Sequence, residues 1–254
     1  MKISIVTPVY NGEKFIDQTI QSILAQKFRN FQHIVMDGLS EDNTLEIVKK
    51  YSNINLVSQK DSGQTNALNE GFKLVDGDIL AWQNGDDLYF PDTFQIVNDF
   101  FESNPTVDLV YGNYQLINEK DNLICNVSPP HWNKWLFIHG RFCPVQPTVF
   151  WRKEVFEAVK PLDEKLFFCM DVDFYSRAIK LGFKFEKINQ LLGKFRVHDE
   201  SKTQNKLNVK KHFKEYNDVL SKRFDYKISD FLFFYFFTLR ASITSKLSKI
   251  GPGY

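Results

Sequence analysis

The first 105 residues of this chain alternate between short apolar runs and amphipathic stretches, and this alternation constrains the fold more than any other feature. Short apolar runs are typical of buried strands, whereas apolar positions three or four residues apart are typical of helices. The order of strand, helix and strand predicts an α/β fold with a Rossmann-like, mostly parallel central sheet and helices on both faces. The predicted strands are 3–6, 31–36, 54–57 and 79–82, and the predicted helices are 13–27, 42–51, 63–74 and 91–102.

The rest of the chain has a less regular pattern. Residues 128–147 are rich in Pro, His and Trp and are typical of a long loop, and loops of that length are often functional. We expect one α/β domain over 1–203, followed by a C-terminal helical extension over 204–254. The pattern predicts strands at 107–114, 123–127, 183–188 and 191–197, and helices at 171–181, 204–224 and 228–248.

Charge and cysteine usage exclude several classes of protein. The net charge of +1 gives no general signal for nucleic-acid binding, so we expect no nucleic-acid partner. The three cysteines are odd in number and lack CxxC spacing, which argues against a disulfide framework and favours a reducing, cytoplasmic location. The first apolar run ends at Pro8, too early for a secretion signal, and no run approaches the roughly 18 apolar residues of a membrane span.

Polar side chains follow each of the first four predicted strands, at Thr7–Asn11, Asp37, Asp61 and Asp86–Asp87. Ligands of such sheets bind beyond the carboxyl ends of the strands, so we expect these residues to converge on one edge. The adjacent carboxylates of Asp86 and Asp87 repel each other unless a cation is bound, and oxygen ligands suit Mg²⁺ or Mn²⁺. A solvated turn is the alternative, because Asn-Gly and Asp are favoured in turns.

Two of these strand ends also suit a nucleoside. Asp37 can accept a hydrogen bond from a base N–H, or it can serve as a helix cap. The segment from Thr7 to Asn11 can wrap a nucleoside with Tyr10 or Pro8 against the base, or it can be an ordinary turn. The chain has neither GxGxxG after its first strand nor GxxxxGK[ST], so neither the usual dinucleotide fold nor a P-loop is indicated.

An ordered set of segments between residue 3 and about residue 203 resembles glycosyltransferase family 2, whose members have the GT-A fold. Several pieces in the same order and spacing are far more specific than any one of them. The segments are Ile5-Val6-Thr7-Pro8-Val9-Tyr10-Asn11, the stretch from Val35 to Thr44, Asp61-Ser62-Gly63-Gln64, the stretch from Gly77 to Asp87, Met170-Asp171-Val172-Asp173-Phe174, and Phe195-Arg196-Val197-His198.

The resemblance implies a role for each matching position. Many members of the family carry Asp where this chain has Asn84, which leaves Asp86 and Asp87 as the expected metal ligands. Asp171 matches the catalytic base, although its place at a predicted helix start is also explained by the helix dipole alone. The implied roles are a nucleoside pocket for Thr7, Pro8 and Tyr10, a base contact for Asp37, a place near the donor for Asp61 and Asn84, diphosphate and metal binding for Asp86 and Asp87, and metal or diphosphate contact for His198.

The implied reaction is the inverting transfer of a sugar from a nucleotide-diphosphate donor to an acceptor hydroxyl. Asp171 would accept the proton of the attacking hydroxyl, while Mn²⁺ or Mg²⁺ offsets charge on the leaving diphosphate. The resemblance makes a UDP-sugar the default donor and a sugar or a lipid-linked saccharide the acceptor, in bacterial surface polysaccharide or glycolipid synthesis. We expect part of the acceptor pocket in the segment 128–147, which contains His131, Trp132, Trp135, His139 and Arg141.

Three other functions remain open at this point. A sugar nucleotidyltransferase would need a glycine-rich, basic loop after its first strand, but residues 7–13 hold only Gly12 and no arginine. A non-catalytic nucleotide-sugar-binding module is favoured by loss of Asp86, Asp87 or Asp171, and all three are present. The aromatic stretch 231–237, flanked by basic residues, can dock on a membrane interface, on a second subunit in a homodimer, or on the catalytic domain, so an adaptor role is the third alternative.

Overall fold

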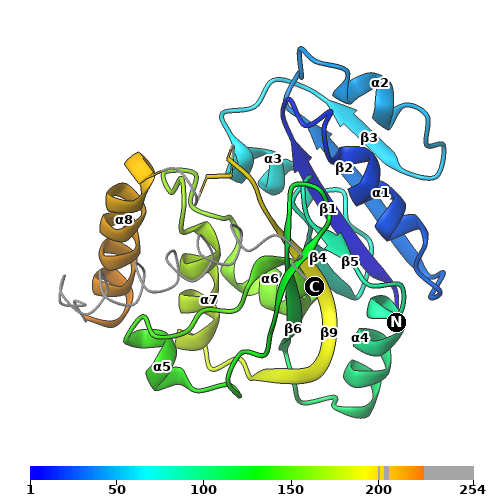
Figure 1. Ribbon diagram of the computed structural model, residues 1–254. Coiled ribbons are helices and arrows are strands. Elements are labelled where there is room, and N and C mark those ends of the chain that lie inside the picture. The colour runs from blue at the N-terminus through cyan, green and yellow to red at the C-terminus, as the bar shows by residue number, and fades with distance from the viewer. Residues whose placement is uncertain (200, 203–205, 226–254) are drawn as a thin grey trace, which may run out of the picture.

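The computed structural model describes residues 1–199, 201–202 and 206–225, and for residues 206 and 207 it describes the backbone only. Within them the predicted α/β fold is confirmed (Figure 1). The strands are β1 Ile3–Val9, β2 Phe31–Asp37, β3 Asn55–Ser58, β4 Ile79–Trp82, β5 Leu88–Tyr89, β6 Leu109–Asn118, β7 Leu123–Val127, β8 Phe150–Arg152 and β9 Phe185–Val197. The helices are α1 Ile16–Leu24, α2 Thr44–Val48, α3 Gln64–Gly71, α4 Thr93–Ser103, α5 Lys134–Ile138, the 3₁₀ turn η1 Gln146–Thr148, α6 Lys153–Val159, α7 Met170–Lys180 and α8 Lys206–Phe224.

The nine strands form one mixed sheet in the order β3-β2-β1-β4-β8-β6-β9-β5, with β7 paired to β6. The first four strands in this order are parallel, as the sequence predicts. β8 then pairs antiparallel with both β4 and β6, and β5 pairs antiparallel with β9. The sheet therefore contains more antiparallel pairs than expected. The strands β5 and β8 that form these pairs were not predicted, because two or three residues are too few to show a periodic pattern.

Helices cover both faces of the sheet, and alternate residues of its strands serve the two faces. Ile3 and Ile5 of β1 pack with Phe94 and Val97 of α4, whereas Val6 packs with α3 on the other face. Figure 1 shows α1 and α4 on one side of the sheet, and α6 and α7 on the other with α8 outermost. The helix that begins with Met170 is thus held between the sheet and α8.

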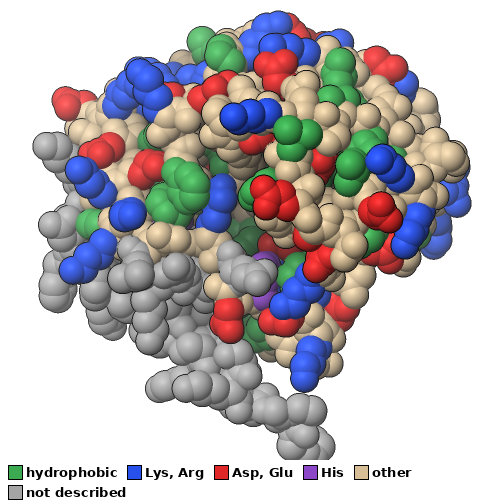
Figure 2. Space-filling model, turned by 90° about the horizontal axis from the view of Figure 1, so that it is seen from above, with side chains coloured by type: hydrophobic (Ala, Val, Ile, Leu, Met, Phe, Trp, Pro, Cys, Tyr) green, Lys and Arg blue, Asp and Glu red, His purple; other side chains and the backbone are tan. Residues whose placement is uncertain are grey.

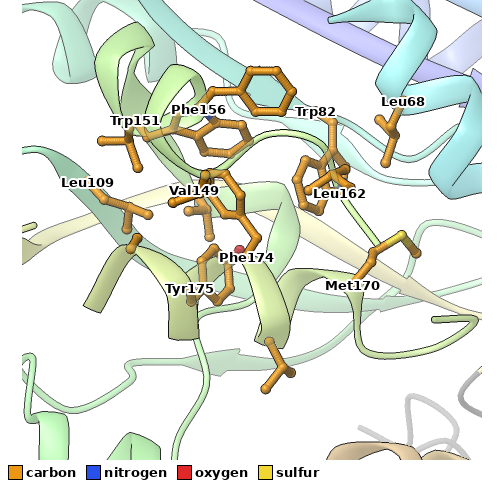
Figure 3. Close-up of a cluster of buried hydrophobic side chains, with 14 of the residues drawn as sticks. Leu68, Trp82, Leu109, Val149, Trp151, Phe156, Leu162, Met170, Phe174 and Tyr175 are labelled. Atoms are coloured by element: carbon orange, nitrogen blue, oxygen red, sulfur yellow. The ribbon is translucent and has the colours of Figure 1, made fainter. Parts of the chain in front are cut away.

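Aromatic side chains fix α7 against the sheet (Figure 3). The rings of Trp82 in β4 and Trp151 in β8 meet edge to face with centroids 5.4 Å apart, and Phe174 of α7 lies 5.0 Å from Trp151. All three side chains are buried, and full burial of a large apolar side chain contributes roughly 1.5–3 kcal/mol. This cluster determines where the first turn of α7 meets the edge of the sheet.

The C-terminal part of the chain differs most from expectation. The strands predicted at 183–188 and 191–197 are one strand, β9, in which Ile188 pairs with Gly112 and Leu191 with Asn113, so Asn189 and Gln190 form a bulge. The predicted loop 128–147 contains α5 and the start of η1, and α6 was not predicted.

The helix α8 confirms the prediction of a helix at 204–224 within its described residues. Its Tyr216, Val219 and Leu220 belong to the same core cluster as Trp82 and Phe174, so the predicted boundary near residue 203 separates segments that share one core. The predicted helix 228–248, including the aromatic stretch 231–237, lies outside the described residues. Within the described part of the chain, no helix combines the length and apolarity that a membrane span needs.

Candidate active site

The carboxyl ends of β1, β2 and β4 lie at one edge of the sheet because these strands are parallel. Figure 2 looks onto this edge and shows acidic, basic and hydrophobic side chains around a recess in which a histidine is visible. The backbone N–H of Asn11 donates to Ser40 Oγ (2.9 Å), and the Asn11 side chain accepts from the Glu41 N–H (2.8 Å), which ties the end of β1 to the loop after β2.

Asp86 and Asp87 occupy different environments after β4. Asp87 is 1% exposed, and its carboxylate accepts hydrogen bonds from the Arg196 N–H (2.9 Å) and from Asn84 Nδ2 (3.2 Å). Burial, reinforced by the charge of Asp86, raises the pKa of Asp87 well above its ordinary value. The Asp86 side chain is 30% exposed and its Oδ2 lies 2.9 Å from His198 Nε2. Asp87 is thus held inside the turn by hydrogen bonds, whereas Asp86 is partly exposed and pairs with His198.

Arg196 holds the turn that carries both carboxylates. Its guanidinium is fully buried and donates to the Asp86 carbonyl (Nε, 2.8 Å), to Asp121 Oδ1 (2.6 Å) and to Gln18 Oε1 (2.8 Å). It also lies over the Phe15 ring at 4.7 Å. A buried charge is tolerated when its donors are satisfied in this way. No role for Arg196 was predicted, because β9 carries several charged residues and Arg196 differs from them only in its burial.

The residues around Asp86 suit a metal that is only partly bound by protein. His198 follows β9, packs against Phe15 with ring centroids 4.7 Å apart, and presents Nε2 to Asp86. Among the described residues, no group of three or more His, Cys, Asp or Glu side chains could form an all-protein cage. One carboxylate and one imidazole fit Mn²⁺ or Mg²⁺ whose remaining ligands are phosphate oxygens and water.

Three side chains at the end of β1, those of Thr7, Pro8 and Tyr10, were predicted to line a nucleoside pocket, and one of them is exposed. Thr7 is fully buried, and its Oγ1 lies 2.9 Å from Nε2 of His33, whose pKa burial lowers to about 3. Pro8 is also buried, whereas Tyr10 is 59% exposed. A ligand at this edge would meet the Tyr10 ring directly and Thr7 only through the backbone.

Asp37 and Asp61 lie close together at the ends of β2 and β3. Asp37 is buried, and its Oδ2 accepts from Ser58 Oγ at 2.6 Å. Asp61 Oδ1 accepts from the Gly63 N–H at 2.9 Å, and its Oδ2 lies where a Cβ on Gly38 would come within 2.7 Å. Gly38 therefore permits the close approach of the Asp61 carboxylate to the backbone after β2.

Asp171 lies in the first turn of α7, and its carboxyl is only partly exposed. Its Oδ1 accepts from the Val172 N–H at 2.8 Å, and burial raises the pKa of Asp171 to about 6. A carboxylate with a pKa near neutrality can accept a proton from a reacting hydroxyl more effectively than an ordinary aspartate. Asp173, two residues on, is instead buried in ion pairs with Arg177 (2.8 Å) and Arg223 (2.7 Å).

Glu215 of α8 caps the segment that leads into α7, a contact that the sequence did not reveal. Its carboxylate accepts from the backbone N–H groups of Phe167 (3.0 Å), Phe168 (2.6 Å) and Cys169 (2.7 Å). These N–H groups have no helical partner, so the cap satisfies donors that would otherwise be lost. The approach of the chain to Asp171 therefore depends on α8.

The segment predicted for the acceptor pocket divides into a buried and an exposed part. Trp132 packs against the core and stacks on Phe185 with centroids 4.3 Å apart. Trp135 on α5 is 51% exposed, stacks on His139 at 4.1 Å and lies 5.2 Å from the Arg141 guanidinium. His131 is exposed. Figure 1 shows α5 toward the end of the molecule opposite to the carboxyl end of β1.

Comparison with known proteins decides the family. A model of glycosyl transferase family 2 matches residues 4–150, more than half of the chain. The chain belongs to glycosyl transferase family 2. An uncharacterized glycosyltransferase of Rickettsia typhi is 30% identical over 220 residues, which cover 81% of this chain and 67% of the relative. A chondroitin synthase of Escherichia coli is 26% identical over 227 residues, which cover 87% of this chain but only 33% of that protein.

Solved glycosyltransferase structures share the fold. A mannosyltransferase of Pyrobaculum calidifontis, in complex with GDP-Man and Mn²⁺, has a TM-score of 0.67 at 14% identity over 95% of this chain and 69% of its own. S. aureus TarS 1-349 in complex with UDP-GlcNAc has a TM-score of 0.62 at 18% identity over 89% of this chain and 74% of its own. The GT-A fold expected from the sequence is confirmed, and the family makes this chain a glycosyltransferase.

Proposed function

We propose that this glycosyltransferase transfers a sugar from a UDP-sugar, with Mn²⁺ or Mg²⁺, to a hydroxyl of a sugar or lipid-linked saccharide, with inversion at the anomeric carbon. The observation that carries the proposal is the pair formed by Asp86 and His198 beyond the carboxyl end of β4, where the Asp86 side chain stays partly exposed. The chondroitin synthase relative supports a place in polysaccharide synthesis.

Asp86 and His198 would hold the metal, while Asp87 and Arg196 hold the turn. Both Asp87 oxygens already accept hydrogen bonds, so this carboxylate is not free to bind a cation without breaking the turn. When bound, a divalent cation offsets the negative charge that develops on the leaving diphosphate.

Asp171 would act as the base. The acceptor hydroxyl forms a bond to the anomeric carbon, and its proton passes to the Asp171 carboxylate. Displacement by the acceptor from the face opposite to the leaving diphosphate inverts the anomeric configuration. The partly buried carboxyl of Asp171, with a pKa of about 6, supports this role.

The nucleoside would bind between Tyr10 and Asp37. Tyr10 has an exposed ring that can stack on a base. Asp37 has a carboxylate that can accept a hydrogen bond from the base and that already accepts one from Ser58. TarS has been solved with UDP-GlcNAc and the mannosyltransferase with GDP-Man, so UDP and GDP are the first nucleotides to test.

The first prediction contrasts the two neighbouring carboxylates. Calorimetry measures UDP binding with Mn²⁺, with Mg²⁺ and with a chelator. Asp86→Ala should abolish the gain in affinity from the metal and lower the free energy of unfolding by about 1 kcal/mol, because a partly exposed hydrogen bond to His198 is lost. Asp87→Ala should keep part of the metal effect but lower the free energy of unfolding by about 1–3 kcal/mol, because the buried Arg196 N–H and the partly buried Asn84 amide lose their acceptor.

Equal loss of the metal effect in both variants would reject this division of roles. Wild-type protein that binds none of UDP, GDP and dTDP, with either metal, would reject the proposed function itself.

A further inference from the structure

Lys202 carries an ammonium group that has only neutral partners in the described part of the chain. Its Nζ donates to Gln64 Oε1 at 2.7 Å and lies 4.3 Å from the centroid of the Phe167 ring. No carboxylate of the described residues comes within ion-pair distance of this group, and burial lowers the pKa of Lys202. A partly buried ammonium that no carboxylate contacts directly becomes more stable when an anion binds beside it.

The position of Lys202 links the two halves of the proposed site. Gln64, its hydrogen-bond partner, also donates from Nε2 to Asn84 Oδ1 at 2.9 Å, and Asn84 is part of the turn that carries Asp86. Phe167, its ring partner, is bound through its N–H to Glu215 at the approach to α7. The charges of Glu215 and of Asp86 both act on the Lys202 ammonium. The group therefore lies between the proposed metal carboxylate and the helix of the proposed base.

We propose that Lys202 binds the sugar-linked phosphate of the donor and stabilises it as it leaves, a role that rests on the proposed function. The bond between the anomeric carbon and the phosphate oxygen breaks with its electron pair going to that oxygen, while the acceptor oxygen forms the new bond and its proton passes to Asp171. Lys202 keeps its proton and donates a hydrogen bond to the leaving oxygen. Lysine is a common phosphate ligand because its ammonium is a compact charge with three donors. Gln64 Oε1 holds the ammonium in place until the phosphate arrives.

The test compares a nucleoside diphosphate with the matching monophosphate, because only the diphosphate carries the phosphate that Lys202 would bind. The nucleotide is the one among UDP, GDP and dTDP that the wild type binds, and calorimetry is run with Mn²⁺ and with a chelator. Lys202→Met should weaken diphosphate binding on the order of tenfold to hundredfold, the loss typical of a hydrogen bond to a charged group. Binding of the monophosphate should stay within about twofold, and Lys202→Arg should recover part of the lost affinity.

Lys187 of β9 provides a matched control for Lys202. It is also a buried lysine with a neutral partner, since its Nζ donates to Ser128 Oγ at 2.9 Å and burial lowers its pKa. It lies near the start of β9, whereas His198 and Lys202 follow the end of that strand. Lys187→Met should bind both nucleotides as the wild type does.

Three results would overturn the assignment of Lys202. They are unchanged diphosphate affinity in Lys202→Met, an equal loss for diphosphate and monophosphate, and the same selective loss in Lys187→Met. Failure of the wild type to bind any of the three diphosphates is a different result, because it rejects the donor site as a whole.

Discussion

At the residue scale, the protonation state of the Asp171 carboxyl should make the rate of sugar transfer depend on pH. Its pKa is raised to about 6 by burial, and only the ionised form can accept a proton. We therefore predict that kcat/KM is constant above pH 7 and falls about tenfold per pH unit well below pH 6. The measurement is nucleotide release from pH 5 to 8, with a saturating metal concentration. A rate that is independent of pH over this range would exclude Asp171 as the base.

The same burial predicts an effect on stability. The unfolded carboxyl loses its proton near pH 3.8 and the folded one near pH 6, so stability falls as the pH rises through this window. Asp171→Asn removes this cost while keeping an oxygen for the Val172 N–H. The variant should be inactive, and at pH 8 it should be more stable than the wild type by about 1–3 kcal/mol, a gain that is small at pH 4. Urea denaturation at the two pH values measures it, and a loss of stability at pH 8 would contradict it.

Residue positions were predicted from sequence more successfully than residue partners. Asp37, Asp86 and Asp171 lie at the strand or helix ends where local pattern placed them. The inward direction of Thr7 was not predictable, because a strand buried on both faces has no alternation. The contacts of Arg196 and Glu215 join positions far apart in the chain, so no local pattern reveals them.

At the scale of elements, α8 is attached to α7 at two separate points. Glu215 accepts three N–H groups at the approach to α7, and Arg223 pairs with Asp173 one turn into it. The first contact is made by the three residues that lead into Met170 and Asp171, while the second is made by Asp173 inside the helix. The family match ends at residue 150, so both attachments lie outside the matched region.

These two attachments should affect catalysis differently. Glu215→Ala should lower the free energy of unfolding by about 1–3 kcal/mol, since three N–H groups, two of them partly buried, lose their acceptor, and should also lower kcat because Asp171 is displaced. Arg223→Ala should reduce stability through loss of its ion pair but leave kcat near that of the wild type. The measurements are urea denaturation and turnover at saturating donor. Equal losses of kcat in both variants would mean that α8 contributes only general stability.

Strong periodicity made some elements predictable and others not. β4 begins and ends where the apolar run does, because Ile79–Trp82 is buried throughout. The short strands β5 and β8 are stabilised by hydrogen bonds to neighbouring strands, β5 to β9 and β8 to β4 and β6, and not by any pattern in their own residues. β9 runs on through Asn189 and Gln190, which suggested a break, because its partner β6 continues beside it.

At the scale of the whole molecule, one core joins the sheet, α7 and α8. The cluster that contains Trp82 of β4 also contains Phe174 of α7 and Leu220 of α8. The sequence predicted the layered α/β arrangement, because buried strands and amphipathic helices are visible locally. The sequence did not show that α8 packs into this core, because the apolar side chains of a helix do not indicate which other element they contact.

The turn at Asp86 and Asp87 is stabilised by residues that the ribosome adds much later in the synthesis of the chain. Asp87 is bound by Arg196, 109 positions further on, and Asp86 by His198, 112 positions further on. A nascent chain that has emerged from the ribosome only as far as α7 holds both carboxylates and Asp171 but lacks Arg196 and His198. Contacts of such long range form late, and a ligand stabilises only a state that can bind it. We therefore expect sugar nucleotides to stabilise this enzyme only after β9 has joined the sheet, because His198, the partner of Asp86, follows that strand.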